Sequence, residues 1–255
     1  MPDIHNLLNP KIWQSPAKAA IPVLLILMAV QEWRKGYFQN FRLYFKTLKL
    51  RPYLLIAASF LLLSLLAFSQ DRILLVKAQA FQGDFWSFVL LIGRNIGDNV
   101  QFWYFLIAFY WLACACRSAK KAALGFSLLL SSALSGLFAH LFKFVFMRAR
   151  PYAEAGPYSF FNYHEFLHES RAHQSLPSGD VALVSASAAY LFFSVSNPFL
   201  RILMLFFPLL NAYARVALNR HWPSDTAAAM ALGFMAGYFF WNFKKFQQQT
   251  PLPQV

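Results

Sequence analysis

The sequence is poor in charged residues, and acidic residues are the scarcest of them. Only 13% of its 255 residues are charged, with ten aspartates and glutamates against 23 lysines and arginines. A soluble domain of this length has about twice that charged fraction. With 58% hydrophobic residues and a mean hydropathy of +0.43, the composition excludes an ordinary soluble globular domain. It predicts a polytopic membrane protein.

Cysteine is equally scarce. Cys114 and Cys116 lie two positions apart in an apolar segment, so on a helix they point to different sides. This arrangement suits neither a disulfide nor a metal site, and we interpret both as small packing residues. The histidines and acids of the polar segment 151–176 show no standard ligand spacing either. The sequence therefore predicts no metal and no cofactor.

The excess of basic residues amounts to a net charge of +13. Such a charge could indicate nucleic acid binding, but these residues mostly flank apolar runs and form no single stripe. Contact with anionic lipid and the control of membrane topology explain them better. We therefore expect a lipid bilayer as partner and no nucleic acid; the sequence leaves the oligomeric state open.

The apolar runs predict an all-α protein with six core transmembrane helices. They occupy residues 53–69, 102–116, 122–142, 181–195, 202–218 and 226–243. We accordingly divide the chain into an N-terminal region 1–52, a membrane domain 53–243 and a polar tail 244–255. Residues 70–100 are amphipathic and are expected to lie along one membrane surface.

The N-terminal region contains a shorter apolar run, residues 19–30, followed by a segment in which basic and aromatic residues alternate. The run is too short for an ordinary span of about 20 residues. It is an interfacial helix, a re-entrant helix or a short seventh span. The basic aromatic segment suits a helix on the anionic cytoplasmic leaflet.

The positive-inside rule places residues 34–51, 117–121 and 244–245 in the cytoplasm. With six crossings, residues 143–180 and 215–225 then meet at the outer face. Three polar stretches of the sequence therefore come together at one membrane surface. Each has an ordinary structural explanation, and their combination is what suggests a function.

In the first stretch, Lys143 and Arg150 are two helical turns apart, so both can lie on one side, and Pro151 ends the helix. Two cations at a helix end can hold a dianion, although interfacial anchors have the same appearance. The second stretch is Pro177-Ser178-Gly179-Asp180 before an apolar helix. Its free N–H groups and the Ser178 hydroxyl can bind phosphate, or Ser178 or Asp180 is an ordinary N-cap.

The third stretch contains Arg215, His221 and Asp225 between two apolar runs. A histidine acts as a nucleophile when its proton position is fixed, and Asp225 is suitably spaced to hold one ring nitrogen. Arg215 can clamp an anion in a planar fork. The structural alternative is a satisfied interfacial histidine beside a snorkelling arginine.

Taken in order, the pattern K-x6-R-P, P-S-G and R-x5-H-x3-D resembles the three-part signature of the phosphatidic acid phosphatase type 2 superfamily. The resemblance covers roughly residues 53–243. It implies dephosphorylation of a membrane lipid without a metal, through a phosphohistidine. His221 would then attack phosphorus and Asp225 would orient it. The phosphate would be bound by Lys143, Arg150, Ser178, Gly179 and Arg215.

The chain departs from the family pattern at two positions. Ala214 replaces the usual serine before Arg215, and Asp180 replaces the histidine that protonates the leaving oxygen. Three explanations stay open. Asp180 is the acid, a histidine of the outer loop replaces it (His164, His168 or His173), or the protein binds lipid phosphate without turnover.

The Gly179-Asp180 pair also resembles the branch of this superfamily that removes the 4′-phosphate of lipid A. That branch favours lipid A as substrate and the inner membrane of a Gram-negative bacterium as location, with the site facing the periplasm. Undecaprenyl diphosphate, phosphatidylglycerol phosphate and phosphatidic acid remain alternative substrates. A lipid phosphotransferase and a non-catalytic binder or transporter remain alternative functions.

Overall fold

The computed structural model describes residues 16–38, 40–81, 83–161 and 163–249, and regular structure within these ranges is helical. The all-α prediction is confirmed. The helices are α3 (Pro16–Arg34), α4 (Phe41–Thr47), α5 (Arg51–Ser69), α6 (Asp71–Gln79), α7 (Asp84–Ile96), α8 (Asn99–Ala115), α9 (Ala119–Phe146), the 3-10 helix η1 (Pro151–Ala153), α10 (Tyr163–His168), α11 (Gly179–Ser194), α12 (Pro198–Ala217) and α13 (Pro223–Gln249).

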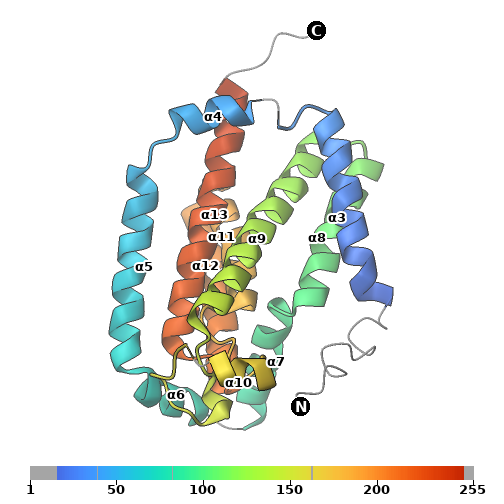
Figure 1. Cartoon of the computed structure of the whole chain (residues 1–255). Coiled ribbons are helices and arrows are strands. Elements are labelled where there is room, and N and C mark those ends of the chain that lie inside the picture. The colour runs from blue at the N-terminus through green and yellow to red at the C-terminus, as the bar shows by residue number, and fades with distance from the viewer. Residues whose placement is uncertain (1–15, 39, 82, 162, 250–255) are drawn as a thin grey trace.

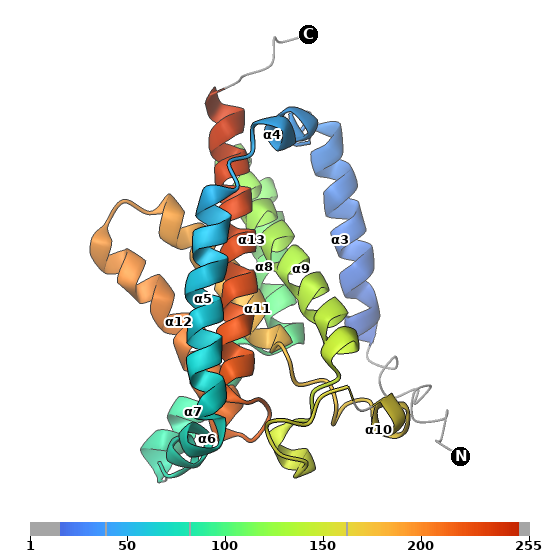
Figure 2. The ribbon, with the colours of Figure 1, turned by 60° about the vertical axis from the view of Figure 1, so that its left-hand side comes forward.

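The long helices run lengthwise through the molecule and the short ones cover its ends (Figures 1 and 2). One end carries α4 and is called the α4 end; the other carries α6, α7 and α10 and is called the α6 end. The six predicted crossings correspond to α5, α8, α9, α11, α12 and α13. Among the described residues, α5, α12 and the segment Ala119–Ala153 are long and apolar enough to cross a membrane, and α8 and α11 contain shorter apolar helices.

Two predicted boundaries differ from the structure. Helix α13 continues past residue 243 to Gln249, so the polar tail begins as helix. The apolar run 19–30 is the centre of the longer helix α3, which lies lengthwise beside α8 with Met28 fully buried. Its 19 residues measure about 28 Å. Helix α3 is not among the helices of the described residues that are long and apolar enough to cross a membrane, and whether it is an interfacial helix, a re-entrant helix or a span stays a prediction.

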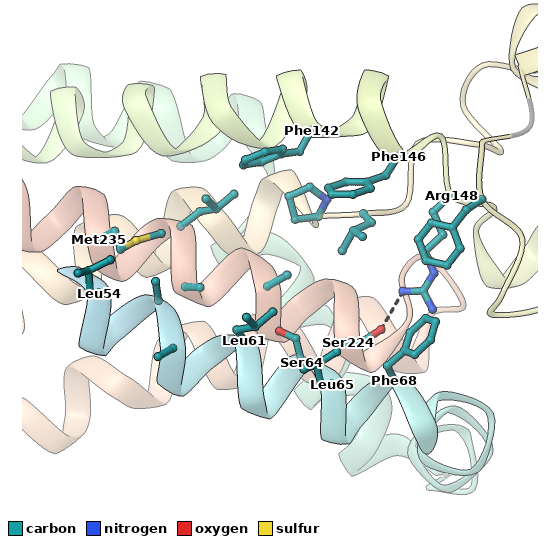
Figure 3. A pocket seen from close by; sticks show the side chains of 18 residues that line it. Leu54, Leu61, Ser64, Leu65, Phe68, Phe142, Phe146, Arg148, Ser224 and Met235 are labelled. Atoms are coloured by element: carbon teal, nitrogen blue, oxygen red, sulfur yellow. Dashed lines mark hydrogen bonds between the residues drawn. The ribbon is translucent and has the colours of Figure 1, made fainter. Parts of the chain in front are cut away.

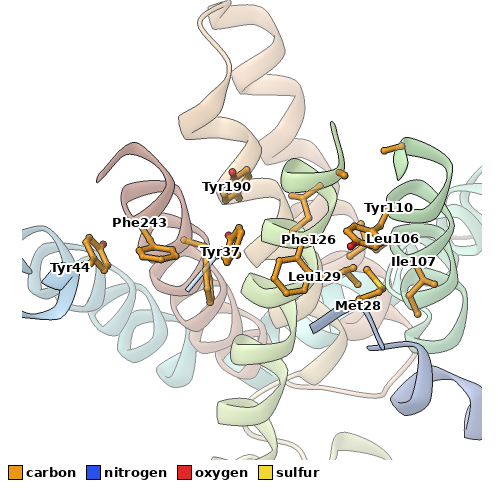
Figure 4. Packing of buried hydrophobic residues seen from close by; sticks show 14 residues of the cluster. Met28, Tyr37, Tyr44, Leu106, Ile107, Tyr110, Phe126, Leu129, Tyr190 and Phe243 are labelled. Carbon is orange, nitrogen blue, oxygen red and sulfur yellow. The ribbon is translucent and has the colours of Figure 1, made fainter. Parts of the chain in front are cut away.

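Aromatic side chains make up half of the buried residues in the core at the α4 end (Figure 4). The rings of Tyr37 and Phe126 meet edge to face at 4.9 Å, and those of Phe41 and Phe243 do so at 5.0 Å. Such contacts add to the burial of large apolar surface. They join α4 and the α3–α4 turn to α9 and α13.

Helices α11 and α13 are in close contact at Gly233 and Gly237. A Cβ at Gly233 would lie 2.4 Å from the Ser185 Cβ, and one at Gly237 would lie 2.4 Å from the Ala186 carbonyl oxygen. Only glycine permits this approach of two backbones. Close packing of this kind is typical of the G-x-x-x-G spacing of Gly233 and Gly237. It sets the position of the two helix N-termini that face the α6 end.

Candidate functional site

The three polar stretches meet at the α6 end through backbone hydrogen bonds. Residues 148–150 leave α9 in an extended conformation, after Met147 with a φ of 42° ends the helix. The Arg150 N–H donates to the Ala172 carbonyl at 2.7 Å, and the Ser175 N–H donates to the Arg148 carbonyl at 3.0 Å. The Ser178 N–H donates to the Asp225 carbonyl at 3.2 Å. All three stretches therefore lie at one end of the molecule, as the topology inferred from the basic residues predicts.

The turn that presents His221 is a Schellman motif at the end of α12. Asn219 takes a left-handed φ of 60°, which asparagine tolerates better than most residues. The Asn219 N–H donates to the Val216 carbonyl at 2.9 Å, and the Arg220 N–H donates to the Arg215 carbonyl at 3.0 Å. This reversal places His221 over the last turn of α12, the turn that contains Arg215.

His221 is buried and held in one tautomer. Its Nδ1 lies 2.8 Å from the Ser175 carbonyl oxygen, which can only accept, so Nδ1 carries the proton and Nε2 carries the lone pair. Burial lowers the pKa of His221 from 6.5 to about 3, and the charges of Arg150 and Lys143 act in the same direction, against Asp225. The imidazole is therefore neutral at physiological pH, the form that a nucleophile requires.

Asp225 is also buried, but its nearest partners are other groups. Its Oδ2 accepts from the Ser175 hydroxyl at 2.5 Å and from the Trp222 N–H at 2.8 Å. The second bond is half of a capping box, because Trp222 precedes α13 and Asp225 lies in its first turn. The same oxygen lies 3.8 Å from His221 Nδ1, too far for a hydrogen bond. The expected Asp225–His221 contact is thus electrostatic, and the Ser175 carbonyl orients the ring.

Arg148 is a residue of this site that the sequence analysis missed. Its guanidinium is fully buried and lies 2.5 Å from Asp225 Oδ1 and 2.6 Å from Asp71 Oδ2. Asp71 in turn accepts from the Ser224 N–H at 2.8 Å and from the Ser224 hydroxyl at 2.6 Å. This network connects α6 to the start of α13. The available signal was the scarcity of acids: Asp71 is one of only ten in the chain.

The residues predicted to bind phosphate surround a common position. A Cβ at Gly179 would lie 3.5 Å from Lys143 Nζ, and the charge of Lys143 interacts with those of Arg150 and Arg215. Ser178 occupies the N-cap position of α11 without making a side-chain cap bond. The buried atoms Ser178 Oγ, Arg150 Nε and Arg215 Nε lack protein partners. Buried donors are rarely left unpaired, so this arrangement is suited to an anion.

Asp180 is engaged by a cation. Its Oδ2 lies 2.9 Å from Arg215 Nη2. Of the loop histidines, His164 and His168 are exposed on α10, whereas His173 is buried with its Nδ1 unpartnered. The neighbours of His173 in the chain, Ala172 and Gln174, both accept hydrogen bonds from Arg150. The structure thus brings Asp180 and the segment containing His173 to the site, and leaves α10 outside it.

An apolar groove of about 680 Å³ leads away from this site between α5, α9 and α13 (Figure 3). Leu54 and Met235 line its far end, and Arg148, Pro177 and Ser224 line the end next to the site. Helix α5, which borders the groove, packs against α13 and has no buried residue of its own. The described residues contain no group of three or more histidines, cysteines or acids that could hold a metal.

Comparison with known proteins agrees with this geometry. Residues 123–249 match the PAP2 superfamily. Comparison with curated proteins gives no match. Among solved structures, the PAP2-type phosphatidylglycerolphosphate phosphatase of Bacillus subtilis is similar with a TM-score of 0.55 and 18% identity, over 78% of this chain and 98% of that one. LpxE of Aquifex aeolicus is similar with a TM-score of 0.50 and 17% identity, over 67% and 93%.

These two neighbours are distant in sequence and establish the transmembrane fold. The family match covers α9, α11, α12 and α13, the helices whose ends carry Lys143, Ser178, Arg215 and Asp225. The chain belongs to the PAP2 superfamily and is a membrane phosphatase of that superfamily.

Proposed function

We propose that the protein removes a phosphate group from a membrane lipid through a phosphohistidine on His221, without a metal. The observation that carries the proposal is the set of unpartnered donors beside a neutral histidine. Arg150 Nε, Arg215 Nε and Ser178 Oγ are buried without partners, next to Lys143. Phosphoryl transfer depends mainly on positioning and on positive charge around the equatorial oxygens.

The proposed reaction has two steps. The His221 Nε2 lone pair attacks phosphorus, the bond between phosphorus and the lipid oxygen breaks, and a general acid protonates that oxygen. Water then attacks the phosphohistidine and gives its proton to the conjugate base of that acid, the N–P bond breaks, and inorganic phosphate leaves. The developing positive charge on the imidazole is stabilised by the Ser175 carbonyl at 2.8 Å and by Asp225 at 3.8 Å.

The general acid is proposed to be Asp180 or His173. Asp180 has the position expected from the family pattern, but its Oδ2 is engaged by Arg215 Nη2 at 2.9 Å. Substrate phosphate would compete for Arg215 and free the carboxylate. His173 is buried with a free ring nitrogen and follows a residue hydrogen-bonded to Arg150. The variants Asp180→Asn and His173→Gln separate the two roles, because only loss of the true acid slows lipid release.

The apolar groove supports a substrate with long hydrocarbon chains. It is lined almost entirely by apolar side chains and reaches Pro177, the residue before Ser178. Lipid A is the favoured substrate, on the resemblance carried by Gly179-Asp180. Phosphatidylglycerol phosphate is the second candidate, because a solved structure with a similar fold is a phosphatidylglycerolphosphate phosphatase. Undecaprenyl diphosphate and phosphatidic acid are the remaining candidate substrates.

Two other functions would use the same site. A lipid phosphotransferase would pass the phosphoryl group from His221 to a second lipid, and its product would carry an additional phosphate. A silent binder would hold lipid phosphate without turnover. The Asp180–Arg215 ion pair is the feature that favours the binder, and the neutral, oriented His221 is the feature against it.

The test is phosphate release by the purified protein in detergent with EDTA, using the four lipids as separate substrates. We expect wild type to release phosphate from one of the lipids and His221→Ala to release none. We also expect wild type, incubated with ³²P-labelled substrate, to carry an acid-labile phosphohistidine. Loop variant His164→Gln serves as control, because His164 is exposed on α10. Lipid product with added phosphate would identify the transferase. Binding of a lipid phosphate without release from any lipid would overturn the phosphatase proposal.

A further inference from the structure

A second polar cavity lies at the α4 end, on the opposite side of the molecule from His221. It has a volume of about 660 Å³ and is formed by the start of α9, the end of α11 and the end of α13. We call it the lysine cavity, after Lys120, Lys121, Lys244 and Lys245, which line it. Lys120 and Lys143 are 23 positions apart on α9, which corresponds to about 35 Å along a helix. The lysine cavity is therefore separate from the proposed phosphatase site.

The four ammonium groups make no ion pair with the residues that the structure describes. Among the residues that the structure describes, no carboxylate lies within 4 Å of them. Glu32, at the same end, already accepts from Lys35 and from the Tyr110 hydroxyl, each at 2.7 Å. Lys120 and Lys244 are close enough to repel each other. Four cations gathered in one concavity without a counter-charge are stabilised when an anion is bound between them.

The backbone adds to this positive field. The lysine cavity includes the N-terminal turn of α9, a helix of 28 residues. That turn has no acidic residue, and Ser118 at the N-cap position makes no side-chain cap bond. Its N–H groups and the helix dipole therefore favour an anion at the same place as Lys120 and Lys121.

One wall of the lysine cavity is apolar. Leu124, Leu191, Val195 and Trp241 line it, and Lys245 lies 5.4 Å from the centre of the Trp241 ring. A free phosphate ion would gain nothing from such a wall. A phospholipid matches both parts, because its phosphate would meet the lysines and its glycerol and first methylenes would meet the wall. Tryptophan is typical of this depth at a membrane surface.

We propose that the lysine cavity binds the headgroup of an anionic phospholipid from the leaflet at the α4 end. By the distribution of basic residues this is the cytoplasmic leaflet. The bound lipid would join α9, α11 and α13, which also carry Lys143, Ser178 and Asp225 at their other ends. It would thus be a structural lipid of the membrane-spanning core, held about one membrane thickness from the catalytic histidine.

The test compares lipid retention by three purified proteins in a nonionic detergent. The first is wild type. The second is the variant Lys120→Gln, Lys121→Gln, Lys244→Gln and Lys245→Gln. The third is a control with the same loss of charge at the same end, Arg34→Gln, Arg42→Gln, Lys46→Gln and Lys49→Gln, all exposed outside the lysine cavity. All three keep the phosphatase site, so binding there cancels in the comparison.

Each protein is titrated with phosphatidylglycerol, phosphatidylcholine or inorganic phosphate. Bound lipid is counted by native mass spectrometry, and the thermal unfolding midpoint is measured in parallel. A lysine near an anionic surface contributes about fivefold in affinity. We therefore expect the cavity variant to bind phosphatidylglycerol at least about tenfold more weakly than wild type, and the control to differ far less. Phosphatidylcholine should leave the midpoint of wild type unchanged. Any response to inorganic phosphate should be equal in wild type and the cavity variant, because it would come from the phosphatase site that both proteins keep.

Three results would overturn the proposal. Wild-type affinity in the cavity variant would remove the lysines from the binding site. An equal loss in the control would assign the binding to diffuse surface charge. Loss of the response to inorganic phosphate in the cavity variant, equal to its loss of phosphatidylglycerol binding, would show an anion site without a lipid.

Discussion

His221 and Asp225 are four positions apart in the sequence, yet each is held mainly by residues far away. The imidazole is oriented by the Ser175 carbonyl, and the carboxylate is bound by Arg148 and the Ser175 hydroxyl. Ser175 therefore contacts both members of the pair, one through its backbone and one through its side chain. At the residue scale, the geometry of the site therefore depends on the segment that carries Ser175 as much as on His221 itself.

The depressed pKa of His221 predicts how stability depends on pH. Below pH 6.5 the unfolded chain binds a proton at this histidine, whereas the folded chain does so only near pH 3. The stability of wild type relative to His221→Gln should be level above pH 6.5 and should fall below it, by up to about 1.4 kcal/mol per pH unit. The measurement is the difference in unfolding midpoint between the two proteins from pH 8 to pH 5. A difference that stays constant would contradict a buried neutral imidazole.

Substitution of Arg148 should strongly lower the stability of the protein. Arg148→Met leaves Asp71 and Asp225 buried without their cation, and breaking such a pair costs about 3–5 kcal/mol. We expect a strongly lowered thermal midpoint together with loss of phosphate release. Arg72→Met is the matched control, since Arg72 is exposed on the same short helix as Asp71 and its loss should cost less than about 0.5 kcal/mol. A stable Arg148→Met protein would mean that the network contributes little.

At the scale of elements, the site is assembled from helix ends. Lys143 lies in the last turn of α9, Arg215 in the last turn of α12, and Asp180 and Asp225 in the first turns of α11 and α13. The relative height of these helices therefore decides whether the phosphate ligands meet. Gly233 and Gly237 set that height for α11 and α13, because their missing side chains let the two backbones touch.

Substitution of Gly237 should therefore affect both stability and activity. In Gly237→Ala the new Cβ would be 2.4 Å from a backbone oxygen of α11, so the helices must separate. Overpacking of this kind costs about 1–3 kcal/mol, and we expect reduced phosphate release as well. In the control Gly136→Ala the Cβ would meet the end of the Leu183 side chain at 2.9 Å, which can move. Equal thermal midpoints for the two variants would show that the α11–α13 contact is not limiting.

At the scale of the whole molecule, the two ends differ in charge and in content. The α4 end carries the basic segments and the lysine cavity, and the α6 end carries His221 and the groove mouth. From the positive-inside rule we expect His221 to face the periplasm.

This orientation predicts the labelling of single cysteines in intact bacterial cells. In a background of Cys114→Ala and Cys116→Ala, a membrane-impermeant maleimide should react with Glu169→Cys from outside. It should react with Lys49→Cys only after lysis. Both positions are exposed in the structure, so accessibility to the reagent does not differ for local reasons. The opposite pattern would place the site in the cytoplasm.

Much of this protein can be predicted from its sequence because the bilayer imposes strong constraints. Apolar runs must be helices that cross or line the membrane, and basic residues bias which loops stay in the cytoplasm. The six predicted runs therefore coincide with helices, and Lys143, Ser178, Arg215 and His221 come together at one end.

Only the tertiary structure decided which groups pair within the site. Arg148 is two positions from Arg150, and nothing local distinguishes the one that binds Asp71 and Asp225 from the one with a free Nε. The Ser175 carbonyl is a backbone atom, so no residue pattern identifies it as the partner of His221. Such hydrogen bonds join segments some 50 to 150 positions apart, as with Ser175–Asp225 and Asp71–Ser224. They depend on how the helix ends pack in three dimensions, and periodicity and spacing describe only the chain along its own axis.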